Sequence, residues 1–133
     1  MPSKIFVNLP VVDLDKSKAF FGTLGYTFNA QFTDETAACM VISDDIYAML
    51  LTEAKFRDFT KKPIADAHQT TEVLIALSVD SKDAVNKLVD AAVKAGGSEA
   101  RDPQDYGFMF LRSFDDLDGH SWEILWMDPK HVQ

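Results

Sequence analysis

Glu123 is the residue with the clearest potential for chemistry in this sequence of 133 residues. It lies in the otherwise apolar segment Ser121–Met127, just after the turn-forming pair Asp118–Gly119. A carboxylate among apolar side chains pays a desolvation cost, so it can serve as a general acid or base, or hold the cation of a ligand. Arg112 and Tyr106 are its candidate partners. The alternative is a carboxylate without a functional role, satisfied by water or by Arg112.

The histidines and the single cysteine point less clearly to a site. His68, His120 and His131 are scattered without the spacing of metal ligands, so we expect them at the surface. His120 is the closest of them to the candidate carboxylate, three residues before Glu123. Cys39 stands in an apolar stretch and is predicted to pack in the core rather than to act as a nucleophile. A lone cysteine cannot form an intramolecular disulfide, which fits a reducing compartment.

Length, composition and charge narrow the class of protein. The chain has the size of about one domain of roughly 100–150 residues, and its 47% hydrophobic content allows a core without disulfide or metal. The net charge of −8 argues against nucleic acid as a partner. The charge weakly favours a cationic ligand, although solubility is the preferred explanation of it. No apolar run approaches the roughly 20 residues that span a bilayer, and residues 1–4 lack the apolar region of a signal peptide. We expect a cytoplasmic protein without a membrane partner.

The elements that would position Glu123 form a pattern that occurs twice. An apolar strand is predicted at 5–12 and again at 73–79, and each is followed by a helix, capped by Asp13 or Asp15 in the first half and by Ser81 in the second. Glycines end both helices, and three short strands follow each. The predicted strands are 26–32, 37–43 and 46–52 in the first half, and 98–101, 107–114 and 121–127 in the second. The sequence thus predicts an α+β fold of two βαβββ modules, at about 4–53 and 72–128, joined by a crossover at 54–71. A site is expected where the halves meet.

Two motifs carry a family resemblance that covers nearly the whole chain. Near the start stand Val11–Val12–Asp13–Leu14–Asp15–Lys16–Ser17, Phe20–Phe21 and Leu24–Gly25–Tyr26, and near the end stands Asp118–Gly119–His120–Ser121–Trp122–Glu123–Ile124. They resemble the opening and closing motifs of the vicinal oxygen chelate superfamily, which includes glyoxalase I, extradiol dioxygenases, and bleomycin- and fosfomycin-resistance proteins. The resemblance implies one domain whose two βαβββ modules curl into a cup, a small-molecule ligand and a homodimer.

The resemblance also implies a divalent metal in the cup, on four side chains. The positions that correspond to its ligands are Phe6, Leu50, Leu74 and Glu123. Three of the four are apolar and offer no lone pair to a cation, and a shift of one residue brings no nitrogen or oxygen ligand to them. The nearest polar alternative is Asn8. A metal is therefore disfavoured and no cofactor is expected.

Strand alternation then predicts which side chains face the cup. The residues expected there are Phe6, Asn8, Ala48, Leu50, Leu74, Ala76, Glu123 and Leu125. They would form an apolar pocket whose few polar groups are Asn8 and Glu123, a common composition for a ligand site. With Tyr106 at the mouth and Arg112 beside Glu123, these are the candidate ligand-binding residues.

Four functions follow from this pocket. The first is a binding protein that holds a small, mainly apolar or cationic molecule without the family metal. The second is a metal enzyme similar to lactoylglutathione lyase or to a dioxygenase. The third is a metal-independent lyase or isomerase that uses Glu123 as acid or base. The last is a protein without catalysis, whose own side chains fill the cup.

Overall fold

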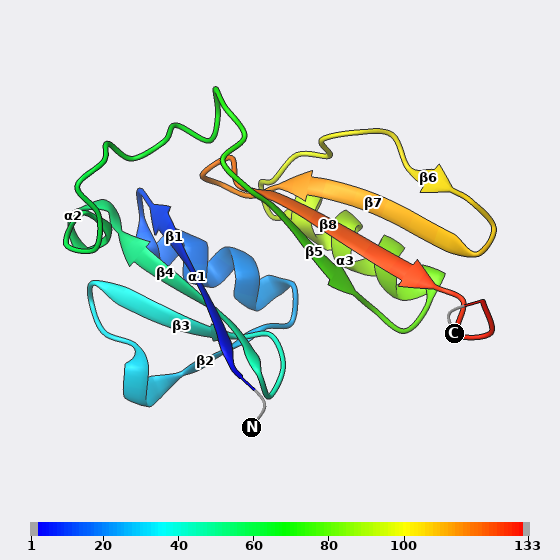
Figure 1. The fold of residues 1–133 in the computed structure, drawn as a ribbon, viewed down its shortest axis with the longest axis horizontal. Helices are drawn as coiled ribbons and strands as arrows, with labels where there is room; N and C mark the ends of the chain where they lie inside the picture. Colours follow the sequence, from blue (N-terminus) through cyan, green and yellow to red (C-terminus); the bar gives the residue numbers. More distant parts are fainter. Residues whose placement is uncertain (1–2, 132–133) are drawn as a thin grey trace. The chain divides into compact units, whose positions relative to one another are not determined.

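The computed structural model describes residues 3–131. The chain divides into two compact units, 1–65 and 66–133. Each unit contains a strand, a helix and three further strands, as Figure 1 shows. The predicted α+β fold of two βαβββ modules is therefore confirmed.

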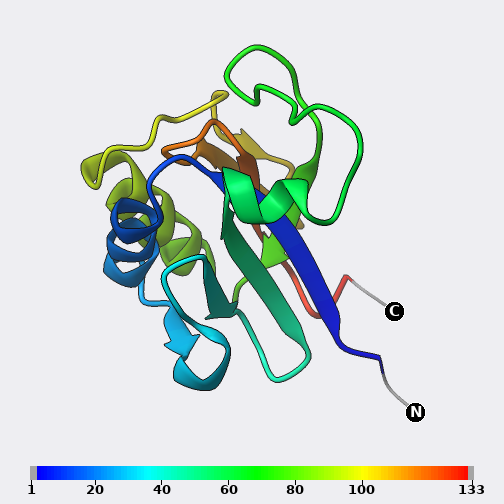
Figure 2. The same ribbon diagram turned by 90° about the vertical axis from the view of Figure 1, so that its left-hand side faces the viewer.

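Unit 1 is built on a four-stranded sheet with the order β1-β4-β3-β2. Its elements are β1 (Ile5–Val11), α1 (Leu14–Thr23), β2 (Thr27–Asn29), a 3-10 helix (Ala30–Phe32), β3 (Ala37–Val41), β4 (Ile46–Thr52) and α2 (Glu53–Arg57). Strands β1 and β4 are parallel, and the other pairs are antiparallel. Helix α1 buries Leu14, Phe20 and Phe21 and packs against β3 and β4 (Figure 2).

Unit 2 repeats this topology with the strand order β5-β8-β7-β6. Its elements are β5 (Leu74–Ser78), α3 (Lys82–Lys94), β6 (Gln104–Asp105), β7 (Met109–Asp115) and β8 (Ser121–Met127). Strands β5 and β8 are parallel, like β1 and β4. Helix α3 buries Val85, Val89 and Ala92 and covers one face of the sheet over β7 and β8. The other face of the sheet is available for a site.

Short polar side chains start the helices. Asp13 rather than Asp15 caps α1, because its Oδ1 accepts a hydrogen bond of 3.1 Å from the Lys16 backbone nitrogen. Ser81 caps α3 in the same way, through a 3.0 Å bond from the Ala84 nitrogen to its Oγ. Such caps satisfy donors that have no partner within the helix. They set where the chain turns from strand to helix in both units.

The sixth strand differs from the prediction. Residues 98–101 were expected to form it, but Ser98 forms only an isolated bridge to Asp115, and β6 is the later pair Gln104–Asp105. Beyond this bridge, the Ala100 nitrogen donates a long hydrogen bond of 3.4 Å to the Ser113 carbonyl oxygen, so the pairing with β7 is too irregular to form a strand. The chain between α3 and β6 is therefore an irregular segment beside β7.

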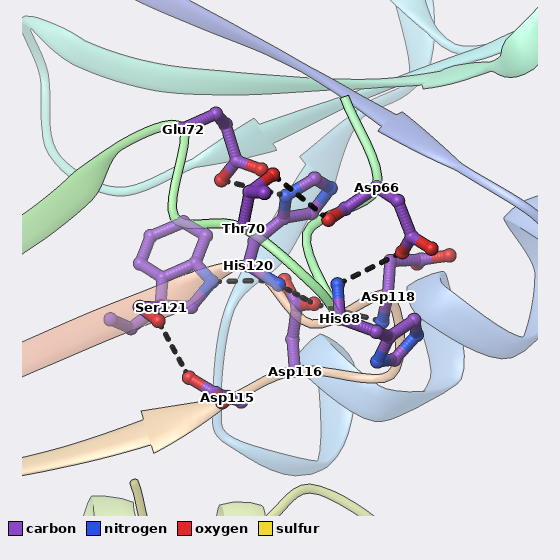
Figure 3. A network of polar contacts seen from close by, with 10 residues as sticks. Asp66, His68, Thr70, Glu72, Asp115, Asp116, Asp118, His120 and Ser121 are labelled. Carbon is purple, nitrogen blue, oxygen red and sulfur yellow. Dashed lines mark hydrogen bonds and ion pairs between the residues drawn. The ribbon is translucent and has the colours of Figure 1, made fainter. Parts of the chain in front are cut away.

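The turn between β7 and β8 is held by a buried carboxylate, drawn in Figure 3. Asp116 Oδ1 accepts hydrogen bonds from the backbone nitrogens of Asp118 (2.9 Å) and His120 (3.0 Å), and Oδ2 accepts one from Trp122 Nε1 (2.9 Å). Gly119 has a φ of +84°, and a Cβ there would lie 2.8 Å from backbone atoms of Ala67 and His68. The turn thus needs glycine both for its conformation and for the close passage of residues 67–68.

Candidate functional site

The site of unit 2 lies on the sheet face that α3 leaves uncovered. Glu123 stands between Ala76 of β5 and Ser113 of β7 in the strand register. Directly paired residues project to the same side of a sheet, so these three side chains form one row. Leu74, Ser121 and Asp115 form the next row. Trp122 and Ile124 project to the opposite side and are buried.

A cavity of about 270 Å³ opens on this face. It is lined by Thr71, Leu74, Ala100, Arg101, Ser113, Asp115, Ser121 and Glu123. An ion pair stands in it, with Arg101 Nη2 at 2.7 Å from Glu123 Oε2. The side chain of Arg101 is 49% exposed and that of Glu123 is 21% exposed. The predicted site residues Leu74 and Glu123 therefore line one cavity, whereas the cation beside Glu123 is Arg101.

Ser113 lies beside this ion pair and is 4% exposed. Its Oγ is buried and has no hydrogen-bond partner within residues 3–131. The neighbouring hydroxyl of Ser121, in contrast, donates a 2.7 Å bond to Asp115 Oδ1. Because buried hydroxyls in proteins are almost always paired, the unpaired Oγ marks a position where the cavity offers an unused hydrogen bond.

The expected pairing of Arg112 with Glu123 is wrong. Arg112 is paired in register with buried Ile124, on the helix side of the sheet. There its guanidinium bonds Glu99 and Asn86 and forms an ion pair with Asp90. Alternation along β7 decides this, because Ser113 and Arg112 are adjacent and must project to opposite faces.

Tyr106 is also separate from the ion pair. It is exposed in the hairpin between β6 and β7, and its hydroxyl donates a 2.6 Å bond to Gln104. It does not line the cavity that contains Glu123. Arg101, which does, had no signal in the sequence, because its side chain reaches Glu123 from an irregular segment to which strand alternation does not apply.

Unit 1 has a cavity of its own, of about 370 Å³, on one face of its sheet. Phe6, Asn8, Phe32, Cys39 and Met49 line it. The cavity is thus mainly apolar, but Leu50, Leu74 and Glu123, which the sequence predicts in the same pocket as Phe6 and Asn8, do not line it. Burial raises the pKa of the Cys39 thiol, which disfavours the reactive thiolate and agrees with a packing role.

The expectation that Leu50 and Ala48 line the site is wrong. Leu50 is 0% exposed and is paired with Leu9, on the side of the sheet that α1 covers. Its neighbour Met49 is paired with Asn8 and projects toward the cavity instead. A displacement of one residue along a strand exchanges its two faces, and only the pairing of β4 with β1 decides between them.

His120 is not a surface residue. It is 2% exposed, and its Nδ1 lies 3.4 Å from Glu72 Oε1 (Figure 3). His68 and His131 are exposed, as expected. The His120 side chain therefore belongs to the buried turn.

Comparisons with known proteins agree with this architecture. A family model described as bleomycin resistance protein-like N-terminal matches residues 4–43. A hypothetical protein from S. aureus is 27% identical, with 95% of this chain and 94% of that chain covered and a TM-score of 0.80. A glyoxalase-related enzyme from Fulvimarina pelagi is 19% identical, over 95% and 88% of the two chains, with a TM-score of 0.79. This chain has the glyoxalase/bleomycin resistance/dioxygenase fold.

Further structures with this fold share little sequence with the chain. A bleomycin resistance determinant encoded on transposon Tn5 is 17% identical, over 96% of this chain and 99% of that chain, with a TM-score of 0.65. No curated protein sequence matches the chain significantly. The motif resemblance is thus confirmed at the level of the fold. Within residues 3–131, no helix is long and apolar enough to cross a membrane.

The metal that the glyoxalase fold implies does not fit the residues of this chain. Phe6, Leu50 and Leu74 carry no lone pair, and the carboxylate of Glu123 is engaged by Arg101. Nor do the described residues contain any group of three or more His, Cys, Asp or Glu side chains that could hold an ion. The chemistry that remains is that of two carboxylates, one guanidinium and one unpaired hydroxyl.

Proposed function

We propose that this protein binds a small, mainly apolar or cationic molecule without a metal ion. The observation that carries the proposal is the unpaired Ser113 Oγ beside the Arg101–Glu123 ion pair, in a cavity of about 270 Å³. A buried hydroxyl without a partner costs about 1–3 kcal/mol. A ligand atom at this position recovers that cost, which gives the cavity a built-in preference for a polar group.

The charge of the unit 2 cavity and the polarity of the unit 1 cavity each support one kind of ligand in the proposal, cationic for unit 2 and apolar for unit 1. The cavity of unit 2 carries the carboxylates of Asp115 and Glu123 against one guanidinium, so its lining has an excess of negative charge. That excess favours a cationic group. The cavity of unit 1, with Phe6, Phe32 and Met49, offers the apolar surface that a hydrocarbon group requires.

Calorimetry with a matched pair of compounds tests the proposal. Benzamidine and benzamide have almost the same shape, but only benzamidine is a cation. We expect the purified protein to bind benzamidine more tightly than benzamide, and Ser113→Ala to weaken this binding. Bleomycin is a third probe, because one structural neighbour is a bleomycin resistance determinant. Glu35→Gln is the control, because it removes an exposed carboxylate that is distant in the sequence from the residues of this cavity.

Elemental analysis of the same preparation tests the metal-independent part. We expect no stoichiometric Ni, Zn, Mn or Fe, and no effect of EDTA on binding or on the melting temperature. A stoichiometric metal whose removal abolishes binding would contradict the proposal. Absence of binding by every probe would contradict it as well.

A metal-independent lyase or isomerase is the second candidate. The observation that favours it is the partly buried Glu123 carboxylate in the cavity, where no donor among residues 3–131 reaches Oε1. Such an oxygen can accept a proton from a bound substrate. Formation of lactoylglutathione, measured with and without EDTA, distinguishes a metal-independent enzyme from a metal enzyme. Activity that survives EDTA and is lost in Glu123→Gln would support this enzyme, and activity that EDTA removes would support a metal enzyme.

We also propose that the protein is a cytoplasmic homodimer. The family resemblance supports the dimer, and the lone cysteine supports a reducing compartment. Light scattering of the purified protein gives its molar mass. A mass twice that of the 14.9 kDa chain is expected, and the mass of a single chain would contradict the dimer.

A further inference from the structure

We infer that Arg101 is a resident counter-ion, which a compact organic cation displaces from Glu123 when it binds. The inference rests on the proposed function and deepens it, because it names the ligand group as an amidinium, guanidinium or ammonium. It also assigns Arg101 as a residue that determines specificity. Three features of unit 2 carry it.

The first feature is the weak attachment of Arg101. Within the described residues its guanidinium has one polar partner, Glu123, through the single contact from Nη2 to Oε2. Its side chain is half-exposed and extends from the irregular segment between α3 and β6. Ion pairs of this exposed kind contribute little to stability, because solvent screens them and two long side chains must be ordered. Arg101 can therefore leave Glu123 at low cost.

The second feature is the hydroxyl that Arg101 leaves unpaired. Ser113 lies directly opposite Glu123 in the strand register, a position at which Cβ atoms are about 4.5–5.5 Å apart. Arg101 bonds Glu123 and makes no bond to Ser113 Oγ. A smaller cation with several N–H groups can donate to the carboxylate and to the hydroxyl together. Only such a ligand gives hydrogen-bond partners to both the Glu123 carboxylate and the Ser113 hydroxyl.

The third feature is the charge that Arg101 does not balance. Asp115 lines the same cavity, and its Oδ1 accepts a hydrogen bond from the neutral hydroxyl of Ser121. With Arg101 in place, the lining carries one carboxylate in excess. A ligand cation is attracted by both carboxylates, whereas a ligand anion is attracted by Arg101 alone and repelled by both. The lining thus selects a cation over an anion.

Substitution of Arg101 tests this inference, because a competing Arg101 and an anchoring Arg101 predict opposite changes in benzamidine affinity. If Arg101 competes with the ligand, Arg101→Gln binds benzamidine more tightly than the wild type, by about 5-fold for an exposed ion pair. If Arg101 instead anchors the ligand, the same variant binds more weakly. Benzamidine, benzamide and benzoate have almost the same shape but are a cation, a neutral molecule and an anion. Calorimetry with the three compounds therefore measures how affinity depends on the charge of the ligand.

Control variants separate this effect from a general change in charge or folding. Arg57→Gln removes an exposed arginine of α2 in unit 1 and is expected to leave benzamidine affinity unchanged. Arg101→Lys retains the cation and is expected to bind like the wild type. Ser113→Ala and Glu123→Gln are expected to weaken benzamidine binding. Thermal melting of each variant checks that it is folded.

The outcomes that overturn the inference are distinct from those that overturn the proposed function. Unchanged or weaker benzamidine binding in Arg101→Gln would overturn the displacement, as would an equal gain in Arg57→Gln. Benzoate binding that is lost in Arg101→Gln would assign Arg101 as an anion anchor and overturn it too. If no probe binds the wild type or any variant, the proposed function itself fails.

Discussion

Arg112 and Glu99 are joined by two hydrogen bonds, from Nε to Oε2 and from Nη2 to Oε1, both 3.0 Å long. The pair lies on the helix side of the unit 2 sheet, where Glu99 raises the pKa of the Arg112 guanidinium above its ordinary value. Glu99 is two residues before Arg101, in the irregular segment that also bonds β7 through the Ala100 nitrogen and the Ser113 carbonyl oxygen. The pair on one face therefore anchors the segment whose arginine reaches the cavity on the other.

Arg112→Lys is expected to lower the free energy of unfolding by about 1–3 kcal/mol, because an ammonium cannot reproduce a two-bond contact with a carboxylate. Chemical denaturation measures the change. Asp45→Asn, which breaks the exposed 3.5 Å ion pair with Lys4, is the control and is expected to cost less than about 1 kcal/mol. Equal costs in the two variants would show that the Arg112 contacts contribute no more than a surface ion pair.

Ser113→Ala and Ser121→Ala form a matched pair on the cavity face. Loss of the unpaired Ser113 hydroxyl is expected to leave the free energy of unfolding unchanged or to raise it, by up to about 1 kcal/mol. Loss of the Ser121 hydroxyl removes its 2.7 Å bond to Asp115 and is expected to cost about 1 kcal/mol. Denaturation curves of both variants test the difference. A clear destabilisation by Ser113→Ala would show that this hydroxyl has a partner.

Gly119→Ala and Gly107→Ala separate backbone conformation from close packing. Both glycines have a positive φ, of +84° and +82°, so alanine is strained at each by about 1 kcal/mol. Only at Gly119 does a new Cβ meet backbone, at 2.8 Å from Ala67 and His68, whereas nothing lies within 4 Å at Gly107. Gly119→Ala is therefore expected to lower the melting temperature much further than Gly107→Ala. Similar losses would contradict the close passage of residues 67–68.

The buried Asp116 carboxylate predicts a pH dependence of stability. Burial raises its pKa above the ordinary value, and this outweighs the opposing effects of His120 and of its hydrogen bonds. The folded protein then binds a proton more tightly than the unfolded chain, so this contribution is fully present at low pH. It is lost as the pH rises from the unfolded pKa of 3.8 through the folded value.

Comparison with Asp116→Asn isolates this contribution. The wild type minus variant difference in unfolding free energy is expected to fall over the range of pH above the unfolded pKa of 3.8. Because an amide cannot accept from the backbone donors and from Trp122 Nε1 together, the variant is also expected to lose about 1–3 kcal/mol. Denaturation of both proteins across this range measures the two effects. A difference that rises with pH would contradict the direction of the shift.

The elements that depend on near neighbours can be predicted from the amino-acid sequence alone. Residues 121–127 form β8 as predicted, and Ser81 caps α3 as predicted. Alternation also placed Leu74 and Glu123 on one face, and Phe6 with Asn8 beside an apolar cavity. These features follow from side-chain periodicity and from bonds within a few residues, which a sequence displays directly.

The partners of these residues, in contrast, depend on contacts that form only in the folded chain. The register of β4 against β1 turned Met49 rather than Leu50 toward the cavity, and burial of the β7–β8 turn enclosed His120. The cation beside Glu123 is Arg101 and not Arg112, because Arg112 projects to the helix side of the sheet and Arg101 reaches Glu123 from the irregular segment between α3 and β6. Contacts between residues distant in sequence depend on how whole strands pair, and no local pattern encodes that pairing.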